Sequence, residues 1–237
     1  RPRSTSRLKR MPDSDDDRGR SRIAQYLALA HEKPALFENS ADGGLVLLLD
    51  EADIHLAERN AAKRLERQGL PRTWADVGIV YEDEYLFILR DGVRFPDGTS
   101  GTYVRIVNRE CRSTGVAVLP IWNAKVLLVR HFRHSTRAWH LEIPRGFASK
   151  GLSSEESARA ELAEETGSIA SRLVPLGGLH TDTGLTSERV DLFFAETAQV
   201  GRPEKHEAIA ELLSVGVGEC ERLIRVGEIT DSFTIAA

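Results

Sequence analysis

The sequence predicts an α/β protein with an N-terminal α+β extension, in which an α/β/α sandwich is built around a mixed β-sheet. Three observations lead to this fold class. Short apolar segments with the length of strands recur through the second half of the chain, one strongly helical segment lies among them, and two helical segments precede them. Helices that alternate with short strands pack against the faces of a sheet. Of the 237 residues, 41% are hydrophobic and 29% are charged, which is typical of a globular protein.

The first 77 residues are predicted to form a charged arm and a small extension. Residues 1–22 are charged and have no apolar period, so we expect them to be disordered. Residues 23–77 form the extension. Apolar residues at helical spacing in "RIAQYLALAHEKPALF" predict a short helix, and "GLVLLLD" predicts a strand. A second helix is predicted in "EADIHLAERNAAKRLERQG", which Gly69 and Pro71 close.

Residues 78–237 are predicted to form the main domain. Successive strands are expected in "ADVGIVYEDEYLFILRDGVRFPDGTSGTYVRIV", with a turn at residues 96–98. The segment "GVAVLPIWNAKVLLVRHFRH" predicts a hairpin closed across "WNAK", and "WHLEIPRG" predicts a short strand. An acidic helix follows, then a strand, a loop and a strand in "LVPLGGLHTDTGLTSERVDLFFAE", and finally a short helix that Asp231 can cap.

Three glutamates share one face of the acidic helix, within "ARAELAEETG". A helix advances about 100° per residue, so Glu161, Glu164 and Glu165 fall within an arc of about 100°. They lie near the helix C-terminus, where the helix dipole disfavours negative charge, and no lysine at i+4 offsets them. One interpretation is a solvated acidic face. The other is a cation site, because carboxylates are the ligands that Mg²⁺ and Mn²⁺ prefer.

The stretch "GFASKGLSSEESARAELAEETGS", residues 146–168, resembles the Nudix box. That motif is a glycine, five residues, a glutamate, seven residues, then Arg-Glu-aliphatic-x-Glu-Glu-x-Gly-aliphatic. Six of its nine specified positions match: Gly146, Glu161, Leu162, Glu164, Glu165 and Gly167. The resemblance implies the Nudix fold and the hydrolysis of a nucleoside diphosphate linked to another group.

Three positions depart from the motif. Leu152 replaces the first glutamate, and Ser168 replaces the last aliphatic residue, a role that Ile169 can fill. The third departure is Ala160, which replaces the arginine. An arginine there lies one turn before Glu164 and can hold it by an i,i+4 ion pair. We therefore expect Ala160 to affect the ordering of the site and the turnover rate.

The segments around the box resemble those of ADP-ribose and related nucleotide-sugar pyrophosphatases. "VLLVRHFRHSTRAWHLEIPRG" is similar to their Arg-x-x-Arg strand and Glu-aliphatic-Pro-x-Gly segment, and "DTGLTSERVDLFFAE" to their catalytic loop. This resemblance implies metal ligation by Glu161, Glu165, Glu164 and the carbonyl of Arg145, substrate contacts by Arg133, Arg130 and Glu142, and catalysis by Glu188, as general base, and Glu164. Arginine suits this role because its guanidinium offers a phosphate two parallel donors.

The resemblance thus implies Mg²⁺-dependent (or Mn²⁺-dependent) hydrolysis of ADP-ribose or a related nucleoside diphosphate sugar, giving a nucleoside monophosphate and a sugar phosphate. Two alternatives remain open. One is a Nudix hydrolase with another nucleoside-diphosphate substrate. The other is a Nudix fold used as a non-catalytic ligand-sensing or protein-binding module. Retention of all three helix glutamates favours catalysis, since a module that only binds has no need of that repulsion.

Bulk properties predict the compartment and the partners. The net charge of −4 gives no reason to expect nucleic acid binding, and the longest apolar runs are too short to span a membrane. Only two cysteines are present, which favours the reducing cytoplasm. A homodimer is expected, because residues 80–107 resemble the hairpin segment through which related pyrophosphatases pair. Both faces of its strand "YLFIL" are apolar, so one face needs cover.

Overall fold

The computed structural model describes residues 15–109, 115–148, 151–204 and 208–237. The chain divides into two compact units, residues 1–111 and residues 112–237, and each is described by itself. Most of the predicted disordered arm, residues 1–14, lies outside the described residues. Residues 15–22 are helical, so the first helix begins earlier than the sequence suggests.

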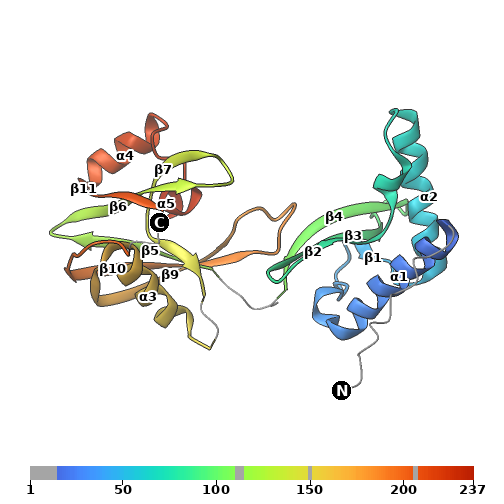
Figure 1. Ribbon diagram of the computed structural model, residues 1–237, viewed down its shortest axis with the longest axis horizontal. Coiled ribbons are helices and arrows are strands. Elements are labelled where there is room, and N and C mark those ends of the chain that lie inside the picture. Colours follow the sequence, from blue (N-terminus) through green and yellow to red (C-terminus); the bar gives the residue numbers. More distant parts are fainter. Residues whose placement is uncertain (1–14, 110–114, 149–150, 205–207) are drawn as a thin grey trace, which may run out of the picture. The chain divides into compact units, whose positions relative to one another are not determined.

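The N-terminal unit combines helices with a four-stranded sheet (Figure 1). Its helices are α1 (Asp15–Glu32) and α2 (Glu51–Arg67), with 3-10 turns η1 (Pro34–Leu36) and η2 (Arg72–Ala75). Its strands are β1 (Val46–Leu47), β2 (Gly78–Glu82), β3 (Leu86–Arg94) and β4 (Ser100–Asn108). All are antiparallel, and β3 pairs with each of the other three.

The core of this unit joins the helices to the sheet. Ile23 and Tyr26 of α1 are buried with Phe87 and Leu89 of β3 in one apolar cluster. Strands β2 to β4 therefore share their core with the segment that precedes them. The sequence places a domain boundary before residue 78, whereas the structure divides the chain after Cys111 because these strands bury their apolar face against α1 and α2.

A charged network lies inside the same core. Tyr26 donates a hydrogen bond to Asp91 Oδ1 at 2.5 Å, and Arg105 Nε donates to Asp91 Oδ2 at 2.6 Å. Asp91 is 1% exposed, so both donors offset the cost of burying its charge. Burial, and then the Asp91 charge, raises the pKa of Tyr26.

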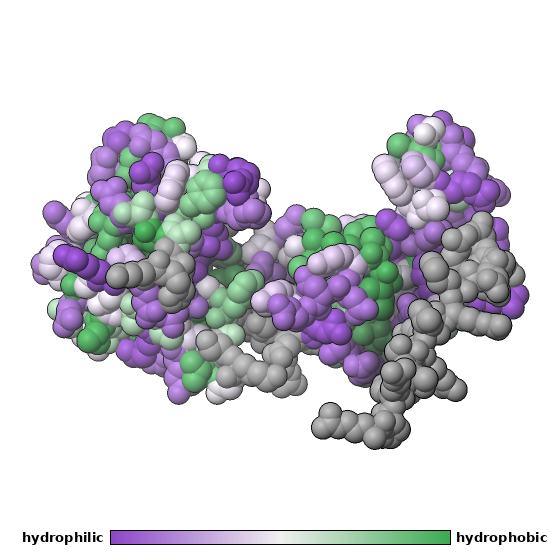
Figure 2. Space-filling model, viewed as in Figure 1, coloured by the Kyte–Doolittle hydropathy of each residue, from purple (hydrophilic) through white to green (hydrophobic). Residues whose placement is uncertain are grey.

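The opposite face of the sheet carries several apolar residues that are only partly covered. Leu86, Ile88, Val104 and Ile106 are half-buried there, and Val80 of β2 is 49% exposed. Figure 2 shows hydrophobic residues gathered on this unit. The predicted alternation along β3 is confirmed, since Phe87 and Leu89 are buried while their neighbours remain partly open.

The second unit is built on a seven-stranded mixed sheet with the order β11-β6-β5-β10-β9, where β7 pairs with β6 and β8 with β5. Its strands are β5 (Gly115–Trp122), β6 (Lys125–Arg133), β7 (Ala138–Glu142), β8 (Arg145–Phe147), β9 (Ile169–His180), β10 (Arg189–Gln199) and β11 (Ile209–Gly216). Its helices are α3 (Ser154–Thr166), α4 (Val217–Arg225) and α5 (Ser232–Ala236). Strands β5 and β10 are parallel, and the other pairs are antiparallel.

Alternate side chains of the central strand β5 pack against different helices. Val116 and Val118 are buried with Leu162 of α3. Ala117 is buried in a second cluster with, among others, Leu223 of α4 and Phe233 of α5. Because successive side chains of a strand point to opposite faces, this arrangement places helices on both sides of the sheet. The predicted α/β/α sandwich and the α+β extension are confirmed.

Several predicted turns are also confirmed. Asn123 and Ala124 join β5 to β6 with φ of 49° and 59°, the left-handed values of a two-residue hairpin turn. Gly98 turns between β3 and β4 at φ 84°. No helix or strand was predicted for residues 209–225, which form β11 and α4. Within the described residues, no helix is long and apolar enough to span a bilayer.

Candidate active site

Local signals in the sequence define both ends of helix α3. Ser153 accepts a hydrogen bond from the backbone of Glu156, whose side chain accepts one from Ser153 N at 2.7 Å. This reciprocal capping box fixes the start of the helix. Gly167 ends it in the left-handed conformation at φ 62°. The helix therefore holds its three glutamates in a fixed register over the sheet.

Two carboxylates of α3, one turn apart, face the backbone of β8. The carboxylate of Glu161 lies so close to Gly146 that a β-carbon built there would be 2.3 Å from its atoms. Glu165 is 2% exposed and accepts a hydrogen bond from Arg145 N at 3.1 Å. The Pro-x-Gly turn and the acidic helix, which are separate in sequence, thus meet as the resemblance implied.

A second carboxylate group adjoins the first. Glu142, at the end of β7, is 1% exposed, and Arg133 Nη2 lies 2.5 Å from its Oε1 atom. Arg145 Nη2 lies 3.5 Å from the other oxygen of Glu142. The two arginines offset the charge of this buried carboxylate, and the carboxylate in turn holds both guanidinium groups in place. Glu142 therefore positions the arginines that the sequence assigned to the substrate and the metal.

His131 links the two carboxylate groups and was not assigned to the site from the sequence. Its Nδ1 atom lies 3.4 Å from Glu142 Oε1 and 3.7 Å from Glu165 Oε1. Burial, and then the charges of Arg133 and Arg145, lower the pKa of His131 to about 4, so its ring is neutral at pH 7. One signal could have revealed it: His131 lies two residues before Arg133 on the same strand, so both point to the same face.

Burial also shifts both inner carboxyl groups. The pKa of Glu165 is raised to about 8, mainly by desolvation, although the charge of Arg133 and the hydrogen bond from Arg145 N act in the opposite direction. The charges of Glu161 and Glu142 add to the increase. Burial also raises the pKa of Glu142, although the charges of Arg133 and Arg145 oppose this increase. Without a cation, Glu165 is therefore largely protonated at neutral pH.

These residues fit a hard divalent cation. Glu161, Glu165 and the adjacent Arg145 backbone offer oxygen donors, and positive charge would favour the ionised form of a carboxyl group that burial now neutralises. Among the described residues, no group of three or more His, Cys, Asp or Glu side chains is arranged to hold a metal. A complete ligand set would therefore need the backbone carbonyl or water in addition to the carboxylates.

For the remaining residues implied by the resemblance, the described contacts are with other parts of the unit. The described contacts of Glu188 are with its own loop, where Thr181 Oγ1 donates to its carboxylate at 3.2 Å. Glu164 is half-buried, and its carbonyl accepts a hydrogen bond from Glu204 N at 2.8 Å. Arg130 lies over the Trp139 ring, 5.2 Å from its centroid, and alternates with His131 and Arg133 along β6. Its guanidinium is thus held on the opposite face of the strand.

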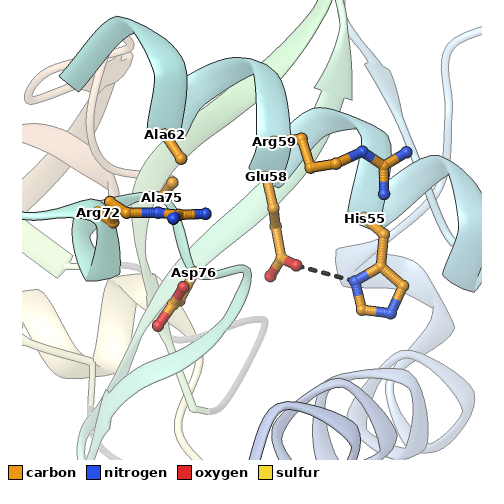
Figure 3. Close-up of a pocket in the computed structure, with 7 residues that line it drawn as sticks. All are labelled: His55, Glu58, Arg59, Ala62, Arg72, Ala75 and Asp76. Atoms are coloured by element: carbon orange, nitrogen blue, oxygen red, sulfur yellow. Dashed lines mark hydrogen bonds and ion pairs between the residues drawn. The ribbon is translucent and has the colours of Figure 1, made fainter. Parts of the chain in front are cut away.

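A separate pocket of about 170 Å³ lies within the N-terminal unit (Figure 3). Its central carboxylate, Glu58, accepts a hydrogen bond from Val77 N at 2.8 Å, pairs with Arg22 at 2.8 Å and contacts His55 at 3.1 Å. These contacts fasten α2 to α1 and to the start of β2. The pocket contains none of the residues that the sequence assigned to catalysis, and we regard its ion pairs as structural.

Comparison with known proteins agrees with this geometry. A model of the NUDIX domain matches residues 112–219, beginning at the first residue of the second unit. An ADP-ribose pyrophosphatase of Bacillus subtilis (strain 168) is 31% identical over 126 residues, which make up 52% of this chain and 68% of that protein. A crystal structure of an ADP compounds hydrolase is similar in fold, with a TM-score of 0.59 and 20% identity over 68% of this chain and 86% of that chain.

Proposed function

The chain belongs to the Nudix family and is a Nudix hydrolase of the ADP-ribose pyrophosphatase type, and from that premise we propose its substrate and its metal. The substrate is ADP-ribose or a related nucleoside diphosphate sugar. Hydrolysis of the pyrophosphate bond, dependent on Mg²⁺ or Mn²⁺, gives a nucleoside monophosphate and a sugar phosphate. The relative from Bacillus subtilis, which is named for its action on ADP-ribose, supports this substrate class.

One observation carries the proposal. Two acidic residues one turn apart on α3 face the backbone of β8, Glu161 at Gly146 and Glu165 at Arg145, and two arginines lie beside them on a third, buried carboxylate. Acidic oxygens suit a divalent cation, and guanidinium groups suit the phosphates of an anionic substrate. A site that only bound a sugar would have no use for both charges at this proximity.

The residues take separate roles in cation binding, phosphate binding and proton transfer. Glu161, Glu165 and the carbonyl of Arg145 would hold the cation, which supplies positive charge to the pyrophosphate and activates water. Arg133 binds a phosphate oxygen, and Glu142 fixes the orientation of its guanidinium. Glu188 takes the proton of the attacking water once its loop, residues 181–188, closes over the substrate. In this structure the loop holds Glu188 through Thr181.

A panel of nucleoside diphosphate sugars, assayed with Mg²⁺ and scored for released phosphomonoester, tests this function. We expect ADP-ribose or a close analogue to be among the best substrates, and excess chelator to abolish turnover. Glu188→Gln should lower kcat with little change in KM. Turnover of a different dinucleotide with no sugar-phosphate product would favour the alternative of another nucleoside-diphosphate substrate.

We also propose the state and place in which the enzyme works. The partly covered sheet face of the N-terminal unit supports a homodimer, because half-buried Ile88 and exposed Val80 gain cover there from a second copy. The low cysteine content supports the cytoplasm, and Cys220 is a buried free thiol. The partner is then a small nucleotide, with neither a membrane nor a nucleic acid required.

A further inference from the structure

A second cavity, this one in the catalytic unit, is lined in part by Glu142 and has a volume of about 230 Å³. The turn between β6 and β7 forms one wall, and residues 230–232, at the start of α5, form another. We propose that this pocket binds the sugar-phosphate half of the substrate. The inference rests on the proposed function and deepens it, since it assigns residues that recognise the sugar rather than the base or the metal.

Every residue that lines the pocket has a polar or charged side chain. Its lining comprises Arg133, Ser135, Thr136, His140, Glu142, Arg145, Thr230, Asp231 and Ser232. No phenylalanine, tyrosine or tryptophan is among these residues, so the pocket lacks the aromatic surface on which a nucleotide base stacks. A group with many hydroxyls and a phosphate matches this lining, because hydroxyl, carboxylate and guanidinium groups together supply both donors and acceptors.

Three side chains form a hydroxyl-bearing chain across the pocket. Thr136 Oγ1 lies 2.7 Å from His140 Nε2, and Thr230 Oγ1 lies 3.4 Å from His140 Nδ1. The ring of a neutral histidine donates from one nitrogen and accepts at the other, and each hydroxyl keeps further capacity to donate or accept. The β6–β7 turn and the C-terminal segment thus present two threonine hydroxyls held at a fixed separation by one imidazole.

The charged side of the pocket has a buried donor that lacks a hydrogen-bond partner. Arg133 Nε is buried without a hydrogen-bond partner, whereas Arg133 Nη2 is in ionic contact with Glu142 Oε1 at 2.5 Å and Arg145 Nε lies 3.5 Å from Asp231 Oδ1. Buried polar atoms normally find partners, so the donor at Arg133 Nε points to a ligand or water that accepts from it. A phosphate monoester beside the two arginines would supply acceptors.

The C-terminal wall is rigidly attached to the catalytic strands. Asp231 accepts hydrogen bonds from Thr234 N at 2.9 Å and Thr234 Oγ1 at 2.8 Å, and Thr234 Oγ1 accepts one from Ile143 N at 2.9 Å. The guanidinium of Arg145 lies over the Phe233 ring, 4.9 Å from its centroid. The threonine hydroxyls therefore stand at a set distance from the arginines, as recognition of a rigid sugar ring requires.

Binding of ribose 5-phosphate and of methyl phosphate to the metal-free, full-length protein tests the proposal without relying on activity. Both ligands carry the same phosphate monoester, and only the first carries a hydroxylated ring. By ligand-observed NMR titration we expect ribose 5-phosphate to bind roughly tenfold more tightly, and the double variant Thr136→Val with Thr230→Val to lose that preference. Affinity for methyl phosphate should stay the same. Thr197→Val, which removes a hydroxyl from β10 that bonds Ile121 O, serves as the matched control and should keep the preference.

Each outcome decides between the alternatives. Equal binding of the two ligands, no binding of either, or a preference that survives in the double variant would overturn the sugar pocket. A preference that disappears in the double variant and persists in Thr197→Val supports it. Because no turnover is measured, failure of the protein to hydrolyse nucleoside diphosphate sugars would count against the proposed function alone.

Discussion

The carboxylate of Glu161 lies directly against the Cα of Gly146, where a β-carbon would come within 2.3 Å of it. This contact joins the first and the central positions of the Nudix box across the turn into β8. It explains why the motif needs glycine there, since any side chain would displace the carboxylate from the backbone that faces it.

Gly146→Ala should weaken Mg²⁺ binding by about 10- to 100-fold and lower turnover similarly, because the methyl group pushes Glu161 away from its position. Isothermal titration with Mg²⁺, together with the hydrolysis assay, measures both effects. Gly218→Ala in α4 is the matched control, because nothing lies within 4 Å of a β-carbon built there. Normal metal affinity in Gly146→Ala would show that Glu161 is not a ligand.

Glu165→Gln should reduce turnover by about 100-fold or more and should not unfold the protein. Burial raises the pKa of this carboxyl group from 4.5 to about 8, so the folded state favours its protonated form. Its stability contribution is fully present below pH 4.5 and is lost as the pH rises through about 8. The metal-free Gln variant should therefore gain on the wild type across this window, by up to about 1.4 kcal/mol per pH unit.

Thermal or urea unfolding of both proteins at a series of pH values between about 5 and 8 measures this gain. Added Mg²⁺ should raise the stability of the wild type and leave the variant nearly unchanged. If the stability difference were the same at every pH, the carboxyl group of Glu165 would have an ordinary pKa and our account of its burial would be wrong.

Ala160→Arg restores the arginine of the motif and should give a modest gain in Mg²⁺ affinity or turnover. An ion pair with Glu164 one turn later contributes a few tenths of a kcal/mol on a helix, which corresponds to a change of about 1.5- to 2-fold. Ala163→Arg, on an exposed position of the same helix, is the control. A loss of activity in Ala160→Arg alone would indicate that the site has packed around the alanine.

The purified chain should have a mass about twice 26.3 kDa by light scattering at micromolar concentration. Val80→Arg should shift it toward one chain, because a charge at this 49% exposed position opposes burial of the sheet face. Val217→Arg places the same charge at a 54% exposed position on α4 and should leave the mass unchanged. A wild-type mass of one chain would rule out the dimer.

Features set by neighbouring residues were predictable from the sequence. The capping box at Ser153, the glycine that ends α3 at Gly167 and the tight turn at Asn123 each depend on a few consecutive residues. The carboxylate face of α3 follows from helical spacing alone. The Nudix fold followed from the same stretch, because its residues are specified in order along the chain.

Features set by strand pairing and burial could not be predicted from the sequence. The sequence treated Arg130 and Arg133 alike, but the structure places Arg130 over Trp139 and Arg133 beside Glu142. The spacing along β6 places His131 on the same face as Arg133, but its contacts depend on two carboxylates that approach it from β7 and α3, and strand spacing alone does not reveal those.

The hydrogen bond from Ile143 N to Thr234 Oγ1 couples the backbone beside Glu142 to the opening of α5. Ile143 directly follows Glu142, and α5 has five residues, so α5 can open locally without unfolding of the whole unit. Each opening frees the Ile143 amide. Its hydrogen–deuterium exchange rate then reports how often the backbone next to Glu142 loosens, and a ligand that bridges the β6–β7 turn to α5 should slow that exchange while leaving the amides of α2 unaffected.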